Sequence, residues 1–120
     1  MIILFLDDDE YRYKKFKHEK IGYIIEWVQT AQQCIEALEK HASKYSEIWL
    51  DHDLGGETYV DSSLDNTGAG VVRWVQQHQP ETDAIWYVHS LNPVGALNMC
   101  QDLLQTGYRV KRLPFTQLGK

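Results

Sequence analysis

The stretch "IWLDHDLGG" (residues 48–56) runs from an apolar segment directly into three ionisable side chains, and two glycines follow closely. The letters IWL are typical of a buried strand, whereas burying Asp51, His52 and Asp53 without partners would be energetically costly. The stretch therefore predicts a central strand of a sheet. This strand ends at an edge where the polar side chains are exposed or paired with a metal.

Similar short apolar runs recur along the chain and alternate with longer stretches of helical spacing. The predicted strands cover residues 2–6, 23–28, 47–50, 84–88 and 108–110, and the predicted helices cover about 9–19, 30–41, 68–78 and 92–107. This alternation is typical of an α/β fold with a parallel sheet and helices on both of its faces. After the last strand too few residues remain for another full helix.

Capping residues support these helix boundaries. Thr30 and Gln33 form a T-x-x-Q capping box at the start of the second helix. Asn92 is a natural N-cap for the fourth helix, with Pro93 at its first position, and Gly107 is expected to end that helix.

The composition limits the kinds of protein that the chain can be. Its 120 residues, 43% of them hydrophobic and 24% charged, fit a single globular domain over residues 1–120 with a real apolar core. The net charge of -5 argues against general binding to duplex nucleic acid, which relies on a basic surface. A small charged ligand in a local pocket remains compatible with this charge.

The cysteines and the N-terminus indicate the compartment. Cys34 and Cys100 each fall inside a helical pattern, which is typical of small core side chains in a reducing environment. The first apolar run is too short to cross a membrane and lacks the features of a signal peptide. We therefore expect a cytoplasmic protein without a membrane partner.

Polar and ionisable residues follow three of the predicted strands at the points where these strands end. Because the carboxyl ends of parallel strands meet at one edge of the sheet, these residues are expected to lie together there. Carboxylates gathered in this way repel one another unless a cation or a shared proton compensates them. Oxygen ligands suit Mg²⁺ or Mn²⁺, and nearby imidazoles widen the choice to transition metals. The residues are Asp7, Asp8 and Asp9 after the first strand, Asp51, His52 and Asp53 after the third, and His89, Ser90 and Asn92 after the fourth.

Several of these residues also have a structural interpretation. One of Asp8 and Asp9 is expected to cap the next helix. His89 follows an apolar strand, so it is either a neutral core histidine or a catalytic group at the functional edge. Arg12 could add positive charge to the site, but a solvated surface arginine is the favoured interpretation.

The segment of residues 54–67 is about three times longer than the usual loop between a strand and a helix, and loops of this length are often lids or binding loops. Asp65, Asn66 and Thr67 offer polar contacts just before the third helix. The alternative is a surface insertion in which Asp65 or Thr67 only caps that helix.

The motifs "ILFLDDDE", "IWLDHD", "HS" and "RLPF" resemble those of response-regulator receiver domains. This resemblance covers nearly the whole chain. It implies a flavodoxin-like three-layer sandwich with strand order 2-1-3-4-5, in which the last helix is missing. It also implies that Asp7 and Asp8 bind Mg²⁺ and that Asp51 stands in the phosphoacceptor position.

Two departures distinguish the chain from an ordinary receiver domain. Leu113 stands where such domains place a lysine before the proline, although Lys111 and Arg112 are near. His52 and Asp53 replace the usual apolar residues after the phosphoacceptor. The strings "LDHDLGG", "DNTG" and "VHSLNPVGALNM" more closely resemble a divergent branch, the cyclic-phosphate-processing receiver-like domains. That resemblance implies an enzyme acting on a cyclic phosphate or a nucleotide phosphodiester.

The first functional hypothesis is a phosphodiesterase for a cyclic phosphate or a cyclic (oligo)nucleotide. One or two divalent cations would polarise the phosphoryl oxygens and lower the pKa of an attacking water. In a metal-free variant, two histidines act as acid and base. The predicted metal ligands are Asp7, Asp8, Asp51 and Asp53, the catalytic residues are His52, His89 and Asp51, and the substrate-binding residues are Ser90, Asn92 and Thr67.

The second hypothesis is a signalling module. Here Mg²⁺ helps Asp51 to accept a phosphoryl group, Ser90 senses it, and a protein partner reads the resulting change. The missing lysine weakens this hypothesis. A third possibility is a degenerate receiver that binds a nucleotide or a partner without turnover.

Overall fold

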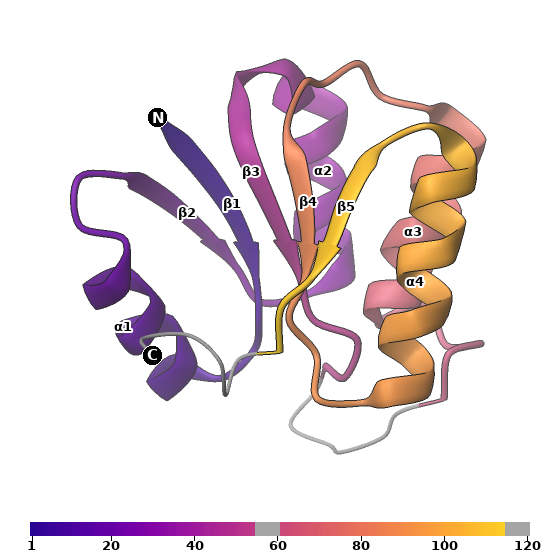
Figure 1. The fold of residues 1–120 in the computed structure, drawn as a ribbon, viewed down its shortest axis with the longest axis horizontal. Helices are drawn as coiled ribbons and strands as arrows, with labels where there is room; N and C mark the ends of the chain where they lie inside the picture. The colour runs from indigo at the N-terminus through magenta and orange to yellow at the C-terminus, as the bar shows by residue number, and fades with distance from the viewer. Residues whose placement is uncertain (55–60, 115–120) are drawn as a thin grey trace.

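Five parallel strands form one sheet in the computed structural model of the chain, which describes residues 1–54 and 61–114 (Figure 1). The strand order is β2-β1-β3-β4-β5, as predicted. Every neighbouring pair is parallel. The strands are β1 (Ile2–Leu6), β2 (Ile24–Val28), β3 (Tyr45–Leu50), β4 (Ile85–Val88) and β5 (Arg109–Arg112).

The helices form a layer on each face of the sheet. One side is covered by α1, while α2, α3 and α4 lie side by side on the other (Figure 1). In the described part of the chain, no helix has the length and apolar character needed to cross a membrane. The elements are α1 (Glu10–Glu19), α2 (Ala31–His41), the short 3₁₀ helix η1 (Ala42–Lys44), α3 (Gly68–His78) and α4 (Pro93–Thr106).

The predicted boundaries agree with the observed ones to within a few residues, because the caps act as the sequence indicates. Thr30 and Gln33 form both hydrogen bonds of the capping box. Asn92 caps α4, which begins at Pro93, and Gly107 ends it with a φ of 106°. Of the predicted long loop, residues 54 and 61–67 are described, and both glycines of "LGG" lie outside the described residues. The segment after residue 114, where a further helix would begin, also lies outside them.

Two apolar clusters hold the layers together, one on each face of the sheet. Side chains alternate along β1, so Ile3 and Phe5 face α1 while Leu4 and Leu6 face the opposite side. Phe5 stacks on Phe16 of α1 with ring centroids 4.2 Å apart. The central strands β1, β3 and β4 are therefore largely buried on both faces, and buried polar residues follow directly at their ends.

The two cysteines belong to the larger of these clusters. Cys34 and Cys100 are both buried free thiols. Burial raises the pKa of each thiol. This confirms the prediction that they are core side chains.

A close backbone approach fixes the start of α3 at the end of β3. The Gly68 N–H donates a hydrogen bond to the carbonyl of His52 at 3.0 Å. A Cβ at Gly68 would lie 2.0 Å from the carbonyl oxygen of Asp51. Only glycine fits here, because every other side chain would collide with the backbone of Asp51, directly after β3.

We predict that Gly68→Ala destabilises the protein by about 1–3 kcal/mol, because the new methyl group forces the start of α3 away from β3. Chemical denaturation measures the change. Gln77→Ala, at an exposed position of the same helix, is the matched control and should shift stability by less than about 0.5 kcal/mol. Equal stability of Gly68→Ala and the wild type would contradict the tight approach.

Candidate functional site

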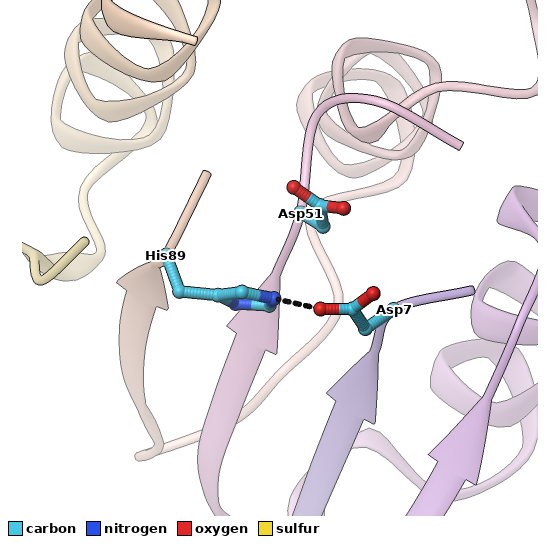
Figure 2. Close-up of side chains that lie close together, drawn as sticks. All are labelled: Asp7, Asp51 and His89. Carbon is cyan, nitrogen blue, oxygen red and sulfur yellow. Dashed lines mark hydrogen bonds and ion pairs between the residues drawn. The ribbon is translucent and has the colours of Figure 1, made fainter. Parts of the chain in front are cut away.

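Three strand ends bring Asp7, Asp51 and His89 together in what we call the acidic centre (Figure 2). Their backbone N–H groups each continue the sheet by donating to the last residue of a neighbouring strand. All three residues are buried, and one potential ligand atom from each lies within 4.8 Å of the other two. The strand register thus builds the cluster that was predicted from the positions after β1, β3 and β4.

Asp7 is hydrogen-bonded at both oxygens of its carboxylate. Its Oδ2 accepts from Arg12 Nε at 2.8 Å and from His89 Nε2 at 3.1 Å. Its Oδ1 accepts from Arg12 Nη2 and from the backbone N–H of Asp9, both at 2.9 Å. Because a carboxylate only accepts, Nε2 of His89 carries the hydrogen in this arrangement. The main-chain carbonyl of Asp7 also accepts from the indole N–H of Trp27 at 2.7 Å.

Asp51 is placed very differently, although it lies beside Asp7. Its Oδ2 is buried and accepts no hydrogen bond from the described residues. The guanidinium of Arg12 comes within 3.5 Å of this oxygen. Of the two neighbouring carboxylates, one is therefore saturated with donors and the other is left nearly bare.

This difference separates the pKa values of the two acids. Burial opposes the ionisation of Asp7, but hydrogen bonds from His89 and Arg12 outweigh it and lower the pKa of Asp7 to about 2. Burial raises the pKa of Asp51 to about 6; the charge of Asp7 adds to the rise, while His89 and Arg12 oppose it. Neighbouring acids with pKa values pushed apart are typical of catalytic and ligand-binding sites.

Arg12 is a member of the site, so its interpretation as a solvated surface arginine is wrong. Its side chain is 29% exposed, forms two hydrogen bonds with Asp7, and lies within 3.7 Å of both Asp8 and Asp9. The hydrogen bond with Asp7 is the main cause that raises the pKa of Arg12. One signal for this role is its position in the first turn of α1, two residues after a run of four acids (residues 7–10).

Leu113 occupies the position of the lysine in ordinary receiver domains, and neither Lys111 nor Arg112 of β5 takes the role of that lysine. Leu113 is half-buried and packs against the apolar cluster on the α1 side of the sheet. Lys111 and Arg112 are exposed. Among the described residues, Arg12 is the cation that pairs with Asp51.

The His89 ring is held by aromatic packing as well as by Asp7. It stacks on Phe5 with centroids 4.9 Å apart and lies 6.1 Å from the ring of Trp49. Its Nδ1 is buried and finds no hydrogen-bond partner among the described residues. His89 is therefore a core side chain whose Nε2 reaches Asp7, and its catalytic role stays a prediction.

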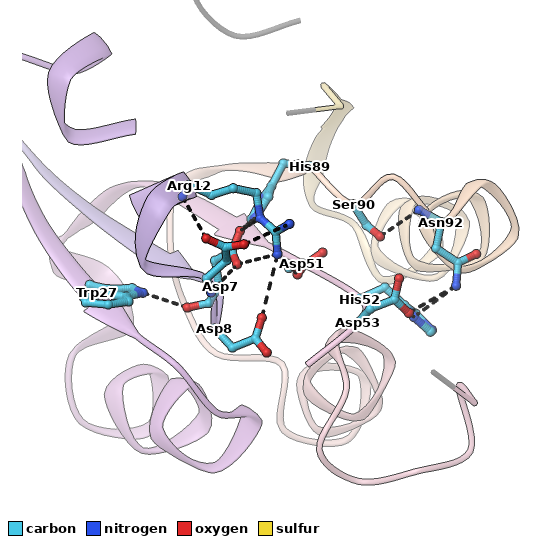
Figure 3. A network of polar contacts seen from close by, with 11 residues as sticks. Asp7, Asp8, Arg12, Trp27, Asp51, His52, Asp53, His89, Ser90 and Asn92 are labelled. Carbon is cyan, nitrogen blue, oxygen red and sulfur yellow. Dashed lines mark hydrogen bonds and ion pairs between the residues drawn. The ribbon is translucent and has the colours of Figure 1, made fainter. Parts of the chain in front are cut away.

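His52 lies in a second polar network, on the α4 side of the sheet (Figure 3). Its Nδ1 donates to Asp53 Oδ1 at 2.8 Å, and its Nε2 lies 2.6 Å from the hydroxyl oxygen of Ser62. Asn92 Nδ2 also donates to Asp53, at 3.3 Å. Gly95 leaves room for the ring, since a Cβ there would lie 2.6 Å from it. The structure therefore separates His52 from His89, and Ser62 is a contact that sequence patterns did not indicate.

The predicted metal ligands are divided between the acidic centre and the His52 network. Asp7 and Asp51 belong to the acidic centre. Asp8 lies next to the centre, 3.7 Å from the guanidinium of Arg12. Asp53 lies in the His52 network instead. Asp9 caps α1, which resolves the choice between Asp8 and Asp9.

The predicted substrate-binding residues lie at the same edge and also form local hydrogen bonds. Ser90 is buried, and its hydroxyl accepts from the N–H of Asn92 at 3.1 Å. Asn92 caps α4 and Thr67 caps α3, so Thr67 rather than the exposed Asp65 is the cap of that helix. The side chain of Asn66 accepts from the first N–H of α2.

The arrangement of strands and helices matches receiver domains of known structure. A sensor protein from a Polaromonas species aligns with a TM-score of 0.63 and 21% identity, covering 98% of this chain and 88% of the other. A signal receiver domain from Vibrio parahaemolyticus gives 0.60 and 22%, covering 94% and 78%. A CheY-like response regulator receiver domain protein from Methanospirillum hungatei gives 0.55 and 19%, covering 98% and 86%. The fold is therefore that of a receiver domain.

The sequence identifies the branch within this class. The model of a family described as "Cyclic-phosphate processing Receiver domain" matches residues 2–105. The chain belongs to this family, which confirms the resemblance seen in its motifs. No functionally curated protein matches the chain. The matched range includes Arg12 and the whole acidic centre.

We predict that Asp51→Asn stabilises the protein above about pH 6 and has little effect below about pH 4. The pKa of Asp51 rises from 3.8 to about 6 on folding. The native state therefore retains a proton that the unfolded chain loses, and ionisation destabilises it as the pH rises. The expected gain is about 1–3 kcal/mol, measured by denaturation with a chelator present. Asp65→Asn, at an exposed position, is the control and should change stability by less than about 0.5 kcal/mol. A flat pH profile for Asp51→Asn would contradict the buried, bare carboxylate.

We predict the opposite sign for Asp7→Asn, which should destabilise the protein by about 2–4 kcal/mol at neutral pH, because it leaves Arg12 and His89 without their charged acceptor. The pKa of Asp7 falls from 3.8 to about 2 on folding. The contribution of the Asp7 carboxylate to the free energy of unfolding is therefore complete above about pH 4 and is lost as the pH falls through the pKa of Asp7 in the folded protein. The same denaturation series measures it, and an unchanged stability would show that the Arg12 pair does not form.

Proposed function

We propose that this chain hydrolyses a cyclic phosphate, either a small cyclic nucleotide or the phosphodiester of a cyclic oligonucleotide, at the acidic centre with a bound Mg²⁺ or Mn²⁺. The observation that best supports this is the buried Asp51 carboxylate, whose Oδ2 accepts no hydrogen bond from the described residues. Burying a second carboxylate beside Asp7 is costly unless a cation compensates both. The printed description of the family supports the choice of a cyclic phosphate.

The residues of the acidic centre fit a divalent cation. Two carboxylates and one imidazole are suitable ligands for Mn²⁺, and the carboxylates suit Mg²⁺. Asp7, Asp51 and His89 would hold the ion, and Asp8 lies close enough to the centre to add charge. A divalent cation bound there polarises phosphoryl oxygens and lowers the pKa of a water molecule.

The other groups at this edge suit a phosphate and its proton transfers. Arg12 presents a planar fork of donors that matches phosphate oxygens. The hydroxyl hydrogen of Ser90 and the N-termini of α3 and α4, capped by Thr67 and Asn92, favour the same anion. His52 is hydrogen-bonded to Asp53 and Ser62. An acid or base role for His52 would therefore act through the hydroxyl of Ser62.

Hydrolysis opens the ring with the uptake of one water. The water oxygen bonds to phosphorus, one ring P–O bond breaks, and the departing oxygen takes up the proton that the water releases. When no ion is bound, a carboxyl whose pKa is near 6, such as Asp51, can exchange that proton near neutral pH. With the ion bound, Asp51 would serve as one of its ligands instead.

Asp51 also stands in the phosphoacceptor position of receiver domains, so a signalling module remains the second candidate. In that case Asp51 accepts a phosphoryl group and a partner protein reads the change. The half-buried Leu113 disfavours this candidate, because an apolar side chain stands just after β5, where receiver domains place a lysine.

We predict turnover of at least one member of a panel of cyclic mononucleotides, cyclic oligonucleotides and RNA ends with a 2′,3′-cyclic phosphate, with Mg²⁺ or Mn²⁺ present. Mass spectrometry detects the gain of one water. Asp51→Asn and His89→Ala should lower the rate by about 100-fold or more, because each removes a group of the acidic centre. Asp65→Asn, at an exposed position, is the control and should retain activity.

The same assay separates the alternatives. Activity that survives a chelator would favour the metal-free variant, in which the two histidines act without an ion. Absence of turnover, together with stable phosphorylation of Asp51 by a small-molecule phosphodonor, would overturn the hydrolase and favour the signalling module. Nucleotide binding with neither reaction would indicate a degenerate receiver.

A further inference from the structure

We propose that Arg12 couples the binding of a divalent cation to the binding of a phosphate at the acidic centre. In the ligand-free protein the guanidinium serves as the resident cation of Asp7. When a divalent ion takes Asp7, Arg12 turns to the phosphate, so each ligand strengthens the binding of the other. This inference rests on the proposed metal site but does not depend on catalysis.

In the ligand-free protein, Asp7 has no carboxylate oxygen left for a metal. Its Oδ2 accepts from both Arg12 and His89, and its Oδ1 accepts from Arg12 and from the N–H of Asp9. The Asp9 N–H is fixed by the backbone at the start of α1. A cation held by His89 and Asp7 ends the His89 hydrogen bond, but it still meets the guanidinium, which bonds both oxygens of Asp7 and repels a cation most strongly. The guanidinium must therefore move aside.

The carboxylate of Asp51 nevertheless gives this cluster negative charge that attracts a cation. Asp51 is 5% exposed, and its Oδ2 points into the centre without a hydrogen bond from the described residues. The Arg12 guanidinium approaches this oxygen only to 3.5 Å. The resident cation therefore neutralises Asp7 well and Asp51 poorly, which leaves the centre with unsatisfied negative charge.

Once it is displaced from Asp7, the Arg12 side chain has room to move and acidic neighbours to hold it. Its backbone is held in the first turn of α1, but its side chain is 29% exposed and is not enclosed by packing. Asp8 and Asp9 lie 3.7 Å away and can keep the guanidinium at the rim of the centre. There it would face a bound divalent ion, and a phosphate between the two cations removes their repulsion.

No cation at the end of β5 can replace Arg12 in this exchange. The end of β5 offers the apolar Leu113 to the sheet, and Lys111 and Arg112 are exposed. Coupling between the two ligands therefore depends on a single side chain. Its removal should separate the two binding events without removing any ligand of the divalent ion.

Calorimetric titration of the full chain with Mg²⁺, with and without saturating inorganic phosphate, tests the inference. In the wild type, phosphate should tighten Mg²⁺ binding by about 10-fold, and Mg²⁺ should tighten phosphate binding by the same factor. In Arg12→Gln, Mg²⁺ alone should bind several-fold more tightly than in the wild type, and phosphate should no longer change its affinity. Arg12→Lys keeps the charge without the planar fork and should retain only part of the coupling.

Lys17→Gln is the matched control, because it removes one positive charge from an exposed position of the same helix. It should keep the full coupling. Circular dichroism establishes that each variant is folded, and Arg12→Lys carries the test if Arg12→Gln is not. Wild-type coupling in Arg12→Gln or Arg12→Lys, or weaker Mg²⁺ binding to Arg12→Gln, would overturn the inference. Absence of Mg²⁺ binding to every form would overturn it together with the proposed metal site, whereas coupling without turnover of any cyclic phosphate would overturn only the hydrolase.

Discussion

Asp7 and Asp51 end neighbouring strands of a parallel sheet, so the register of the sheet itself forces two carboxylates together in a buried position. Two such charges repel strongly where water is excluded. The chain resolves the repulsion unequally. Asp7 receives both hydrogen bonds of the Arg12 fork and one from His89, while Asp51 keeps a bare oxygen and a pKa near 6. The chemistry of the site follows from that inequality.

The residues that follow β3 point to two different sides of the sheet, so "DHD" does not form one cluster. Asp51 turns toward Asp7, and the next residue, His52, turns to the opposite side of the sheet, where α4 begins. There Asp53 and Asn92 lie beside it (Figure 3). Its Nε2 also lies 2.6 Å from the hydroxyl oxygen of Ser62. A motif that is continuous in sequence thus supplies two separate polar networks. Only His89, from the next strand, brings an imidazole to the acidic centre.

Most of the fold and part of the site could be predicted from the sequence, because both depend on local patterns. Apolar runs and caps such as Thr30 and Asn92 define the elements, and the common edge of parallel strands brings Asp7, Asp51 and His89 together. The role of Arg12 could not be predicted in this way. Helical spacing places its backbone but does not say whether its side chain turns to solvent or back across the strand ends. The Ser62 contact likewise joins His52 to a segment whose path no periodicity specifies.

The position of the cation also bears on the choice between hydrolysis and signalling. A lysine after β5 would leave Asp7 free for a metal and would supply positive charge to a phosphoryl group on Asp51. In this chain Leu113 makes that position apolar, and the positive charge comes from α1, where it is already bound to Asp7. A phosphate can therefore gain this charge only when another cation releases Arg12 from Asp7. Such an exchange favours a site that assembles around a bound phosphate ester, and it offers little to hold a phosphoryl group that stays on Asp51.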